Sequence, residues 1–308
     1  MFRSGLAKAL SAKQDVDEEL WRTARSGQWY AASERRLADA NASWLWALFE
    51  PLALDDETLG FLENSQALSD SLALQLYYTL GSYLLQLFMT KTSANGWLGR
   101  GSMFVFSTGQ LGTFLRMPWS AEDTDDEPGR RRAAVVDLGA GDGVVTAKLG
   151  HFFGPVYATE ASKTMRDRLT SRGFELLEVD AWHNVSSYEG ELGLISCLNL
   201  LDRVAEPSRL LGRLHSLAKA KDCVVLVAVV LPWSQYVEFG ETASSAPLEK
   251  VSVTGRTFES QLAGLLEALV LPAGFQLLRW SKVPYICEGD SYSAFYWLQD
   301  ALLLLRPM

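Results

Sequence analysis

The sequence predicts an α/β fold in which a helical N-terminal region precedes a mostly parallel sheet of seven strands. Two observations predict it. After residue 132, short runs rich in valine and leucine alternate with amphipathic segments, the pattern of a parallel sheet with helices on both faces. Before residue 118, apolar residues recur every three or four positions with mixed charges between them, as they do on helices.

A hydrophilic segment separates these two parts. Residues 118–132 contain five acidic side chains followed by Pro128-Gly129, which is typical of a linker. We therefore expect four segments along the 308 residues. They are a flexible or targeting segment (1–17), an N-terminal helical region (18–117), the acidic linker (118–132) and the sheet domain (133–308).

The expected elements follow the hydrophobic pattern in order. In the N-terminal region it predicts helices over Glu18–Ala40 and Asp55–Met89. The strands of the sheet domain are expected at Ala133–Leu138, Pro155–Thr159, Phe174–Val179, Leu192–Asn199, Cys223–Leu231, Phe275–Pro284 and Ala294–Leu305. Its helices are expected at Val144–Leu149, Ala161–Arg172, Glu206–Lys219 and Phe258–Val270. The last two strands form a hairpin, and the polar segment Gly240–Arg256 is expected as a surface loop.

A glycine-rich turn follows the first strand of the sheet domain. Gly139 and Gly141 stand between this strand and the next helix, and a turn without Cβ atoms lets the backbone approach a ligand closely. Glu160 ends the second strand, where an acidic side chain can bind ribose hydroxyls. A plain strand-to-helix turn and a NAD site are the alternatives. The carboxylate of Asp137 favours S-adenosylmethionine (SAM), because SAM is cationic whereas NAD places two phosphates there.

Composition excludes several functional classes. A net charge of −9 argues against a nucleic-acid partner, because a phosphate backbone requires clustered lysine and arginine. The three cysteines and three histidines are scattered and lack the spacing of a disulfide framework or a metal site, so we expect no metal. Ser71–Thr90 is uncharged and long enough to span a membrane. Polar side chains dilute it, however, and we expect a buried helix without an integral membrane span.

Polar side chains follow the third and fourth strands, at the edge where open α/β sheets bind ligands. Asp180 ends the third strand, where it either accepts a hydrogen bond from an adenine amino group or caps a helix. Asn199 ends the fourth strand and is expected beneath the methionine part of SAM. Asp202 lies further along, either near the reacting methyl group or at a helix cap. Tyr285 and Tyr296, near the last hairpin's turn, could line an aromatic substrate slot or belong to the core.

Five segments of the sequence occur together in one known protein family. They are Arg100-Gly-Ser-Met-Phe-Val-Phe-Ser107, Asp137-Leu-Gly-Ala-Gly-Asp-Gly143, Tyr157-Ala-Thr-Glu160, Ile195-Ser-Cys-Leu-Asn-Leu-Leu-Asp-Arg203 and Pro284-Tyr-Ile-Cys-Glu-Gly-Asp290. With these segments the chain resembles the DREV family of class I SAM-dependent methyltransferases, whose sheet is Rossmann-like and seven-stranded. The resemblance runs from about Leu20 to the C-terminus.

The resemblance implies a SAM-dependent protein-histidine methyltransferase. Such an enzyme methylates the pros nitrogen (Nδ1) of histidine in His-x-His segments of protein substrates, where x is small, and releases S-adenosylhomocysteine (SAH). The resemblance implies cofactor contacts by Glu160, Asn199 and Tyr285, and it places Asn199, Asp202 and Tyr296 around the target imidazole, with Tyr285 beside them. Asp202 would accept the Nε2–H bond and leave the lone pair on Nδ1, while the N-terminal helical region covers the peptide.

Two other functions remain open at the level of the sequence. One is a small-molecule N- or O-methyltransferase on the same sheet, and the other is a SAM-binding interaction module without turnover. Val144 and Asp180-Ala181 depart from the family pattern, at the glycine turn and on the adenine side. We expect a monomer. An intracellular compartment is expected, with the endoplasmic reticulum and the mitochondrion as candidates from the resemblance, and the basic segment Met1–Gln14 reads either as a presequence or as a frayed helix.

Overall fold

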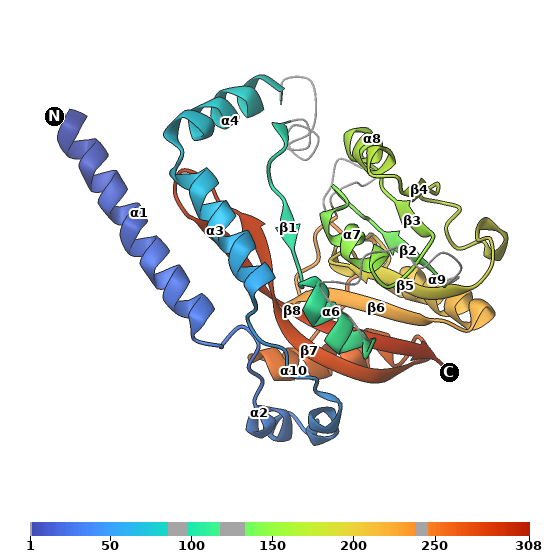
Figure 1. Cartoon of the computed structure of the whole chain (residues 1–308). Helices are drawn as coiled ribbons and strands as arrows, with labels where there is room; N and C mark the ends of the chain where they lie inside the picture. Colours follow the sequence, from blue (N-terminus) through green and yellow to red (C-terminus); the bar gives the residue numbers. More distant parts are fainter. Residues whose placement is uncertain (1, 86–97, 118–132, 238–245) are drawn as a thin grey trace.

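The computed structural model describes residues 2–85, 98–117, 133–237 and 246–308 (Figure 1). Three expectations therefore fall partly or wholly outside the described residues. They are the acidic linker 118–132, the last residues of the helix expected over Asp55–Met89, and the first part of the surface loop expected over Gly240–Arg256.

Helices and strands alternate through the second half of the chain. The helices are α1 (Phe2–Arg25), α2 (Glu34–Asp39), α3 (Asp56–Asp70), α4 (Leu72–Leu85), α6 (Thr108–Leu115), α7 (Val144–Gly150), α8 (Lys163–Ser171), α9 (Pro207–Lys221) and α10 (Phe258–Leu265). The strands are β1 (Met103–Phe104), β2 (Ala134–Leu138), β3 (Val156–Thr159), β4 (Glu175–Leu176), β5 (Leu192–Leu198), β6 (Val224–Leu231), β7 (Phe275–Glu288) and β8 (Phe295–Pro307). Shorter turns of helix lie at η1 (Ser43–Leu48), η2 (Val185–Ser187), η3 (Leu201–Arg203) and η4 (Leu266–Val270).

The described strands form one eight-stranded sheet in the order β1-β7-β8-β6-β5-β2-β3-β4. Neighbours from β4 to β6 pair in parallel, whereas β8 pairs antiparallel with both β6 and β7. The seven strands expected from the sequence are present, and the expected terminal hairpin is confirmed. The eighth strand corrects the expected count. It comes from the N-terminal region, where Met103 and Phe104 pair antiparallel with Cys287 and Ile286 of β7.

Both long helices expected in the N-terminal region are divided in the structure. The helix expected over Glu18–Ala40 is two helices, α1 and α2. They are separated by a turn in which Gly27 adopts a φ of 76°. Ser33 then caps the N-terminus of α2. At its other end α1 extends to Phe2, across the expected boundary at residue 17.

The third strand of the sheet domain is much shorter than expected. It is β4, which ends at Leu176, and the residues Val179 and Asp180 lie in a turn.

The helix expected from Asp55 onward divides at Ser71 into α3 and α4. The expectation that α4 is buried is wrong. Several of its large apolar side chains, including Leu72, Leu76 and Tyr83, are more than half exposed, whereas Gln75 and Tyr78 are buried. No helix in the described residues combines the length and the apolar character needed to cross a membrane.

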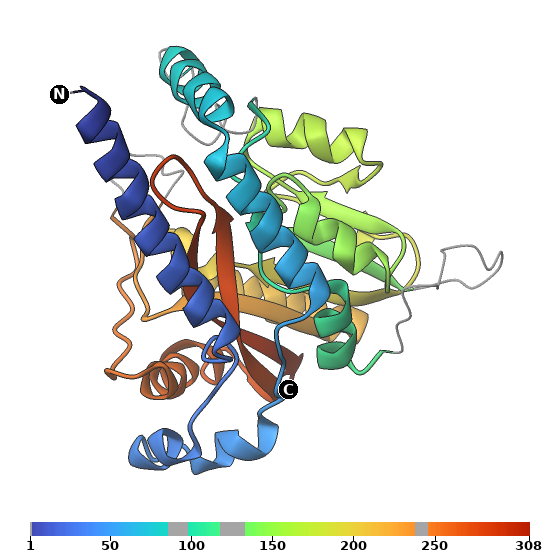
Figure 2. The same ribbon diagram turned by 60° about the vertical axis from the view of Figure 1, so that its left-hand side comes forward.

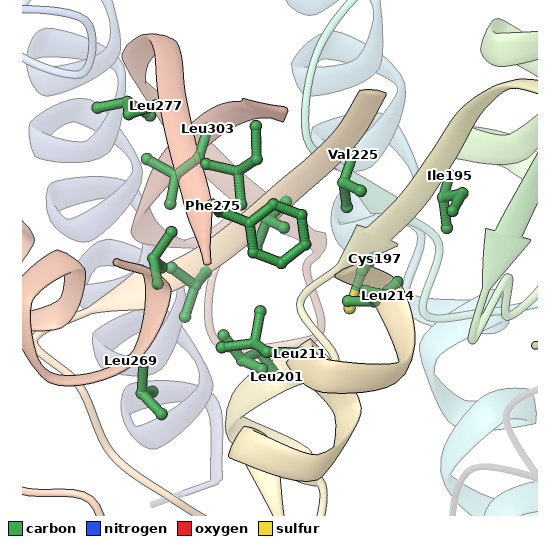
Figure 3. Packing of buried hydrophobic residues seen from close by; sticks show 14 of the residues in the cluster. Ile195, Cys197, Leu201, Leu211, Leu214, Val225, Leu269, Phe275, Leu277 and Leu303 are labelled. Atoms are coloured by element: carbon green, nitrogen blue, oxygen red, sulfur yellow. The ribbon is translucent and has the colours of Figure 1, made fainter. Parts of the chain in front are cut away.

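Two hydrophobic clusters cover the two faces of the sheet. On one face, β5 and β6 pack against α9 and α10, and Ile195, Cys197, Leu211 and Phe275 belong to this cluster (Figure 3). On the other face, the sheet packs against α7 and against α1, α3 and α6 of the N-terminal region (Figures 1 and 2). The N-terminal region therefore contributes part of the protein's core and is built onto the sheet.

Candidate functional site

A cleft of about 830 Å³ lies at the carboxyl ends of β2, β3 and β5. This is the position at which open α/β sheets bind ligands. All of the residues expected to bind the cofactor line it. They are Asp137, Gly139, Gly141, Glu160, Asp180, Asn199 and Tyr285.

The glycine turn forms the floor of the cleft. Gly139 and Gly141 have φ values of 71° and 56°, in the left-handed region that favours glycine. A Cβ atom on Gly139 would lie 3.3 Å from Leu200, whereas a Cβ on Gly141 would meet no atom within 4 Å. The backbone at Gly141 therefore lies open to a ligand. Gly143 has another role, because its Cβ would lie 2.8 Å from Leu169 of α8.

Asp137 lies behind the turn and is almost fully buried. One carboxylate oxygen accepts a hydrogen bond from Thr146 Oγ1 at 2.6 Å, and the other accepts from Ser196 Oγ at 2.5 Å. Burial raises the pKa of Asp137 to about 6, and the two hydroxyl donors partly oppose that shift. Both oxygens are thus engaged inside the protein, where they tie β2 to α7 and β5.

Glu160 lies at the tip of β3 and supports the turn from the other side. Its Oε2 accepts a hydrogen bond from the Gly141 amide at 3.0 Å, and its Oε1 accepts from the Ser162 amide at 2.7 Å. Asp180 is exposed at the edge of the cleft, next to the buried ring of Trp182. No helix begins at Asp180, so the alternative expectation that it is a helix cap is wrong.

Asn199 follows the last residue of β5 with a φ of 52°. Asparagine tolerates this left-handed conformation better than most residues that carry a Cβ. Its side-chain Nδ2 donates a hydrogen bond to Asp300 Oδ2 at 2.7 Å. The other end of the amide, Oδ1, is buried and has no hydrogen-bond partner among the described residues.

The sequence analysis did not identify Asp300. It lies on β8, opposite Val230 of β6 and Val283 of β7, and its side chain is completely buried. Burial and the nearby Asp202 raise its pKa to about 8, whereas the Asn199 hydrogen bond lowers it. A single acidic residue within an apolar strand was the one signal in the sequence.

Asp202 is buried on η3, behind the wall of the cleft. Its Oδ2 lies 3.3 Å from Nε of Arg203, whose side chain does line the cleft. Burial raises the pKa of Asp202, and Arg203 partly opposes that shift. Its Oδ1 has no partner among the described residues. Asp202 lies within η3, so it is not the helix cap that the sequence left as an alternative.

One face of the β7–β8 hairpin continues the wall of the site. Tyr285 pairs with Leu298, and two residues further along Cys287 pairs with Tyr296. Paired residues, and residues two apart in a strand, share a face, so this face also carries Asp300. Burial raises the pKa of Tyr285. Tyr296 is 45 % exposed, lies outside the residues that line the cleft, and donates a hydrogen bond from its hydroxyl to Asp290 Oδ1 at 3.0 Å.

The N-terminal region closes the remaining side of the cleft. The Gly101 amide donates a hydrogen bond to Glu288 Oε2 at 2.7 Å, and Ser102 Oγ donates to Asp142 Oδ2 at 2.8 Å. The Arg100 guanidinium lies over the ring of Tyr78 on α4. The segment is thus fixed both to the hairpin and to the glycine turn. Arg100, Gly101, Met103 and Val105 of this segment line the cleft.

Comparison with known proteins gives a consistent result. The model of the DREV methyltransferase family matches residues 29–307. A TehB-like SAM-dependent methyltransferase from Corynebacterium glutamicum is 14 % identical, with 58 % of this chain and 82 % of that chain covered and a TM-score of 0.35. A SAM-dependent methyltransferase from Anabaena variabilis is 10 % identical, with 57 % and 77 % covered and a TM-score of 0.36.

The family match covers residues 29–307, so it includes the N-terminal helices from α2 onward but not α1, and it confirms the resemblance seen in the sequence. The fold is the mixed α/β, Rossmann-like fold of class I SAM-dependent methyltransferases, with helices added at the N-terminus. The protein is therefore a SAM-dependent methyltransferase that belongs to the DREV family.

Proposed function

We propose that the protein transfers the methyl group of SAM to the pros nitrogen (Nδ1) of a histidine in a His-x-His segment of a protein substrate. One observation carries the proposal. Asn199, Asp202 and Asp300 each present a buried oxygen without a hydrogen-bond partner among the described residues, beside the carboxyl end of β5. Buried acceptors in folded proteins are normally paired. An ammonium group and an imidazole N–H are both donors that suit them.

The residues of the cleft fit SAM. When bound, SAM supplies an electrophilic methyl group on a sulfonium. The open backbone at Gly141 leaves room for close approach, and Glu160 can accept hydrogen bonds from ribose hydroxyls. Asp180 and the ring of Trp182 lie together and suit the adenine. Asn199 Oδ1 can accept a hydrogen bond from the ammonium group of the methionine part.

The target imidazole needs orientation more than activation. A free histidine side chain has a pKa near 6.5, so at pH 7 the ring is mostly neutral and nucleophilic. Asp202 would accept the Nε2–H hydrogen bond, which leaves the lone pair on Nδ1. As the N–C bond forms and the C–S bond breaks, the ring gains a positive charge that the Asp202 carboxylate stabilises. Because Asp202 lies behind the wall, its contact with the ring requires that the Arg203 side chain move aside.

The peptide would lie between the hairpin and the N-terminal wall. Tyr285 and Tyr296 share a face of the hairpin with Asp300, and Arg100 lines the cleft from the N-terminal region. A ring held between these walls meets the methyl group in one orientation, and orientation of this kind supplies several kcal/mol of catalysis.

Incubation with tritiated SAM and a panel of acceptors tests this function. The panel contains a His-Ala-His peptide, variants with one or with both histidines replaced by alanine, and small amines and phenols. We expect label only on the peptides that keep a histidine, and a large loss in Asp202→Ala with SAH affinity retained. Label only on the small acceptors would establish the small-molecule alternative. SAH binding without label on any acceptor would make the protein a binding module.

A further inference from the structure

We propose that Asp300 is a positioning residue whose carboxyl group fixes the side-chain amide of Asn199, so that the amide oxygen faces the ligand. The proposal rests on the function proposed above, in which Asn199 contacts both cofactor and substrate. Asp300 touches neither in this account. It acts through Asn199 and was assigned no role by the sequence.

The geometry of the pair supports this role. An amide has an acceptor end and a donor end, and the two can exchange by a flip of the side chain. The hydrogen bond from Asn199 Nδ2 to Asp300 Oδ2 is 2.7 Å long and selects one orientation. In that orientation Oδ1 is left without a partner among the described residues, although Asn199 lines the cleft. A ligand donor that displaces the atoms covering Oδ1 therefore finds an acceptor without a competing partner among the described residues.

The position of Asp300 argues against a purely structural role. It lies in the middle of β8, completely buried, between strands whose opposing residues are Val230 and Val283. A carboxyl group in such surroundings costs folding free energy, and an apolar residue of similar volume would cost less. In the described part of the chain, the bond to Asn199 is the one hydrogen bond that this side chain makes.

The charged and titratable neighbours of Asp300 belong to two elements. Asp202 and Arg203 lie on η3, and Tyr285 and Cys287 lie on β7. Burial raises the pKa of Cys287 to about 11, so its thiol adds no negative charge near neutral pH. Asp202 is the carboxylate that opposes the ionisation of Asp300. Ionised or protonated, the Asp300 carboxyl group offers an acceptor oxygen, so the hydrogen bond from Asn199 Nδ2 can form in either state.

A double-mutant cycle on SAH affinity, measured by isothermal titration calorimetry, tests the proposal. Asn199→Gly removes the amide, and glycine accepts the φ of 52° without strain. Asp300→Leu removes the anchor. We expect each single variant to weaken SAH binding about tenfold, the typical effect of one lost hydrogen bond to a charged group. The double variant should bind no more weakly than Asn199→Gly alone, because the two residues act through one contact.

A matched control separates positioning from stability. Ser281 is also buried in the β7–β8 pair, and its hydroxyl has no partner in the described part of the chain, so Ser281→Ala should change thermal stability without changing SAH affinity. Asp300→Asn keeps an acceptor for Asn199 Nδ2 and should retain most of the affinity. If Asp300→Leu fails to fold, Asp300→Asn replaces it in the cycle. The smaller loss of SAH affinity caused by Asp300→Asn must then be absent when Asn199 is also replaced by glycine.

Two outcomes would overturn the proposal. One is wild-type SAH affinity in Asp300→Leu, and the other is a double variant whose loss equals the product of the two single losses. The same proteins are assayed in parallel with the His-Ala-His peptide. If no variant or wild-type protein labels the peptide while the SAH cycle is non-additive, the substrate proposal fails and the role of Asp300 stands.

Discussion

Buried carboxyl groups characterise the site at the scale of single residues. Asp137, Asp202 and Asp300 are each at most 3 % exposed, and burial raises the pKa of all three. Their surroundings differ, however. Two hydroxyl donors engage both oxygens of Asp137, whereas Asp202 and Asp300 each keep an unpartnered oxygen among the described residues. Asp137 therefore supports the architecture, whereas in the proposed function Asp202 accepts from the target imidazole and Asp300 acts through Asn199.

Asp300 makes stability depend on pH. Its pKa is about 8 in the folded protein against an ordinary value of 3.8, so between these values the folded state binds more protons than the unfolded state. Stability therefore falls as pH rises, by at most about 1.4 kcal/mol per pH unit for one proton. Asp300→Asn lacks this contribution. Urea unfolding should therefore show that the free energy of unfolding of the variant, relative to that of the wild type, is higher at about pH 8 than at about pH 5.

The comparison isolates Asp300 together with its interaction with Asp202. Asp137 also has a raised pKa, but both proteins contain it and its contribution cancels in the difference, whereas Asp202 is coupled to Asp300 and titrates with it. A stability difference that stays constant between the two pH values would contradict the assignment of a raised pKa to Asp300.

Glu160 lines the cleft and accepts hydrogen bonds from the Gly141 and Ser162 amides, so in the proposed function it would support cofactor binding in two ways. Glutamine presents only one acceptor oxygen, so Glu160→Gln must lose one of these bonds. A hydrogen bond to a charged group contributes about 1.5–3 kcal/mol, and we expect SAH affinity to fall about 10- to 100-fold by calorimetry. Glu178→Gln, which removes an exposed ion pair with Arg166, is the control and should bind SAH normally. If Glu160→Gln bound SAH as tightly as Glu178→Gln, Glu160 would be excluded from the cofactor site.

The site could be read from the sequence where its residues follow strand ends. Glu160, Asn199 and Tyr285 line the cleft as expected, because the carboxyl ends of parallel strands meet at one edge. Asp300 could not be found in this way. Its partner Asn199 is 101 positions away, and nothing in the local pattern of β8 shows that the two strands bring them together. The burial of Asp202 behind Arg203 was likewise invisible in the sequence.

At the scale of elements, the glycine turn combines two different requirements. Gly141 faces open space, while Gly143 is packed against Leu169 and Phe174 beside α8. Both have positive φ values, 56° and 79°. Gly141 thus leaves its backbone open to the cleft, whereas Gly143 lets the turn pack closely against Leu169 and Phe174.

Alanine at each position separates these requirements. Gly143→Ala incurs left-handed strain of about 1–2 kcal/mol together with a clash at 2.8 Å from Leu169. We expect it to lose about 2–4 kcal/mol of unfolding free energy in a thermal or urea scan. Gly141→Ala incurs the strain alone and should lose less stability but more SAH affinity. Equal destabilisation by the two variants would show that the packing at Gly143 is not limiting.

Strongly periodic elements were predicted best. The long strands β5, β6, β7 and β8 and the helix α9 lie where the hydrophobic pattern places them. Short elements were predicted less well. β4 has two residues, and β1 exists only because Met103 and Phe104 meet the edge of β7, a tertiary contact without a local signal. The exposed apolar face of α4 also contradicts its pattern, since apolar composition alone does not show which face is covered.

At the scale of the whole molecule, the N-terminal region and the sheet domain share one core. Phe106 and Phe114 of the N-terminal region belong to the same hydrophobic cluster as Leu194 of β5 and Leu302 of β8. Lys148 of α7 reaches the same region, where its Nζ donates to the Phe106 carbonyl and pairs with Glu57. The cleft is therefore bounded by two parts of the chain that cannot separate without exposing apolar surface.

This shared core predicts cooperative unfolding. Phe106 is fully buried, and Phe106→Ala should lower the free energy of unfolding by about 3–5 kcal/mol. Far-ultraviolet circular dichroism and tryptophan fluorescence should give one coincident transition in both the variant and the wild type. Two separated transitions would show that the N-terminal region folds independently of the sheet.

The position of the transferred methyl group tests the central proposal most directly. A His-Ala-His peptide is methylated with tritiated SAM and hydrolysed completely, and the two methylhistidine isomers are separated by chromatography. Because Asp202 would engage Nε2–H and leave Nδ1 toward the methyl donor, we predict that the label is found in N-pros-methylhistidine. Label in the N-tele isomer, or in no histidine at all, would contradict the account.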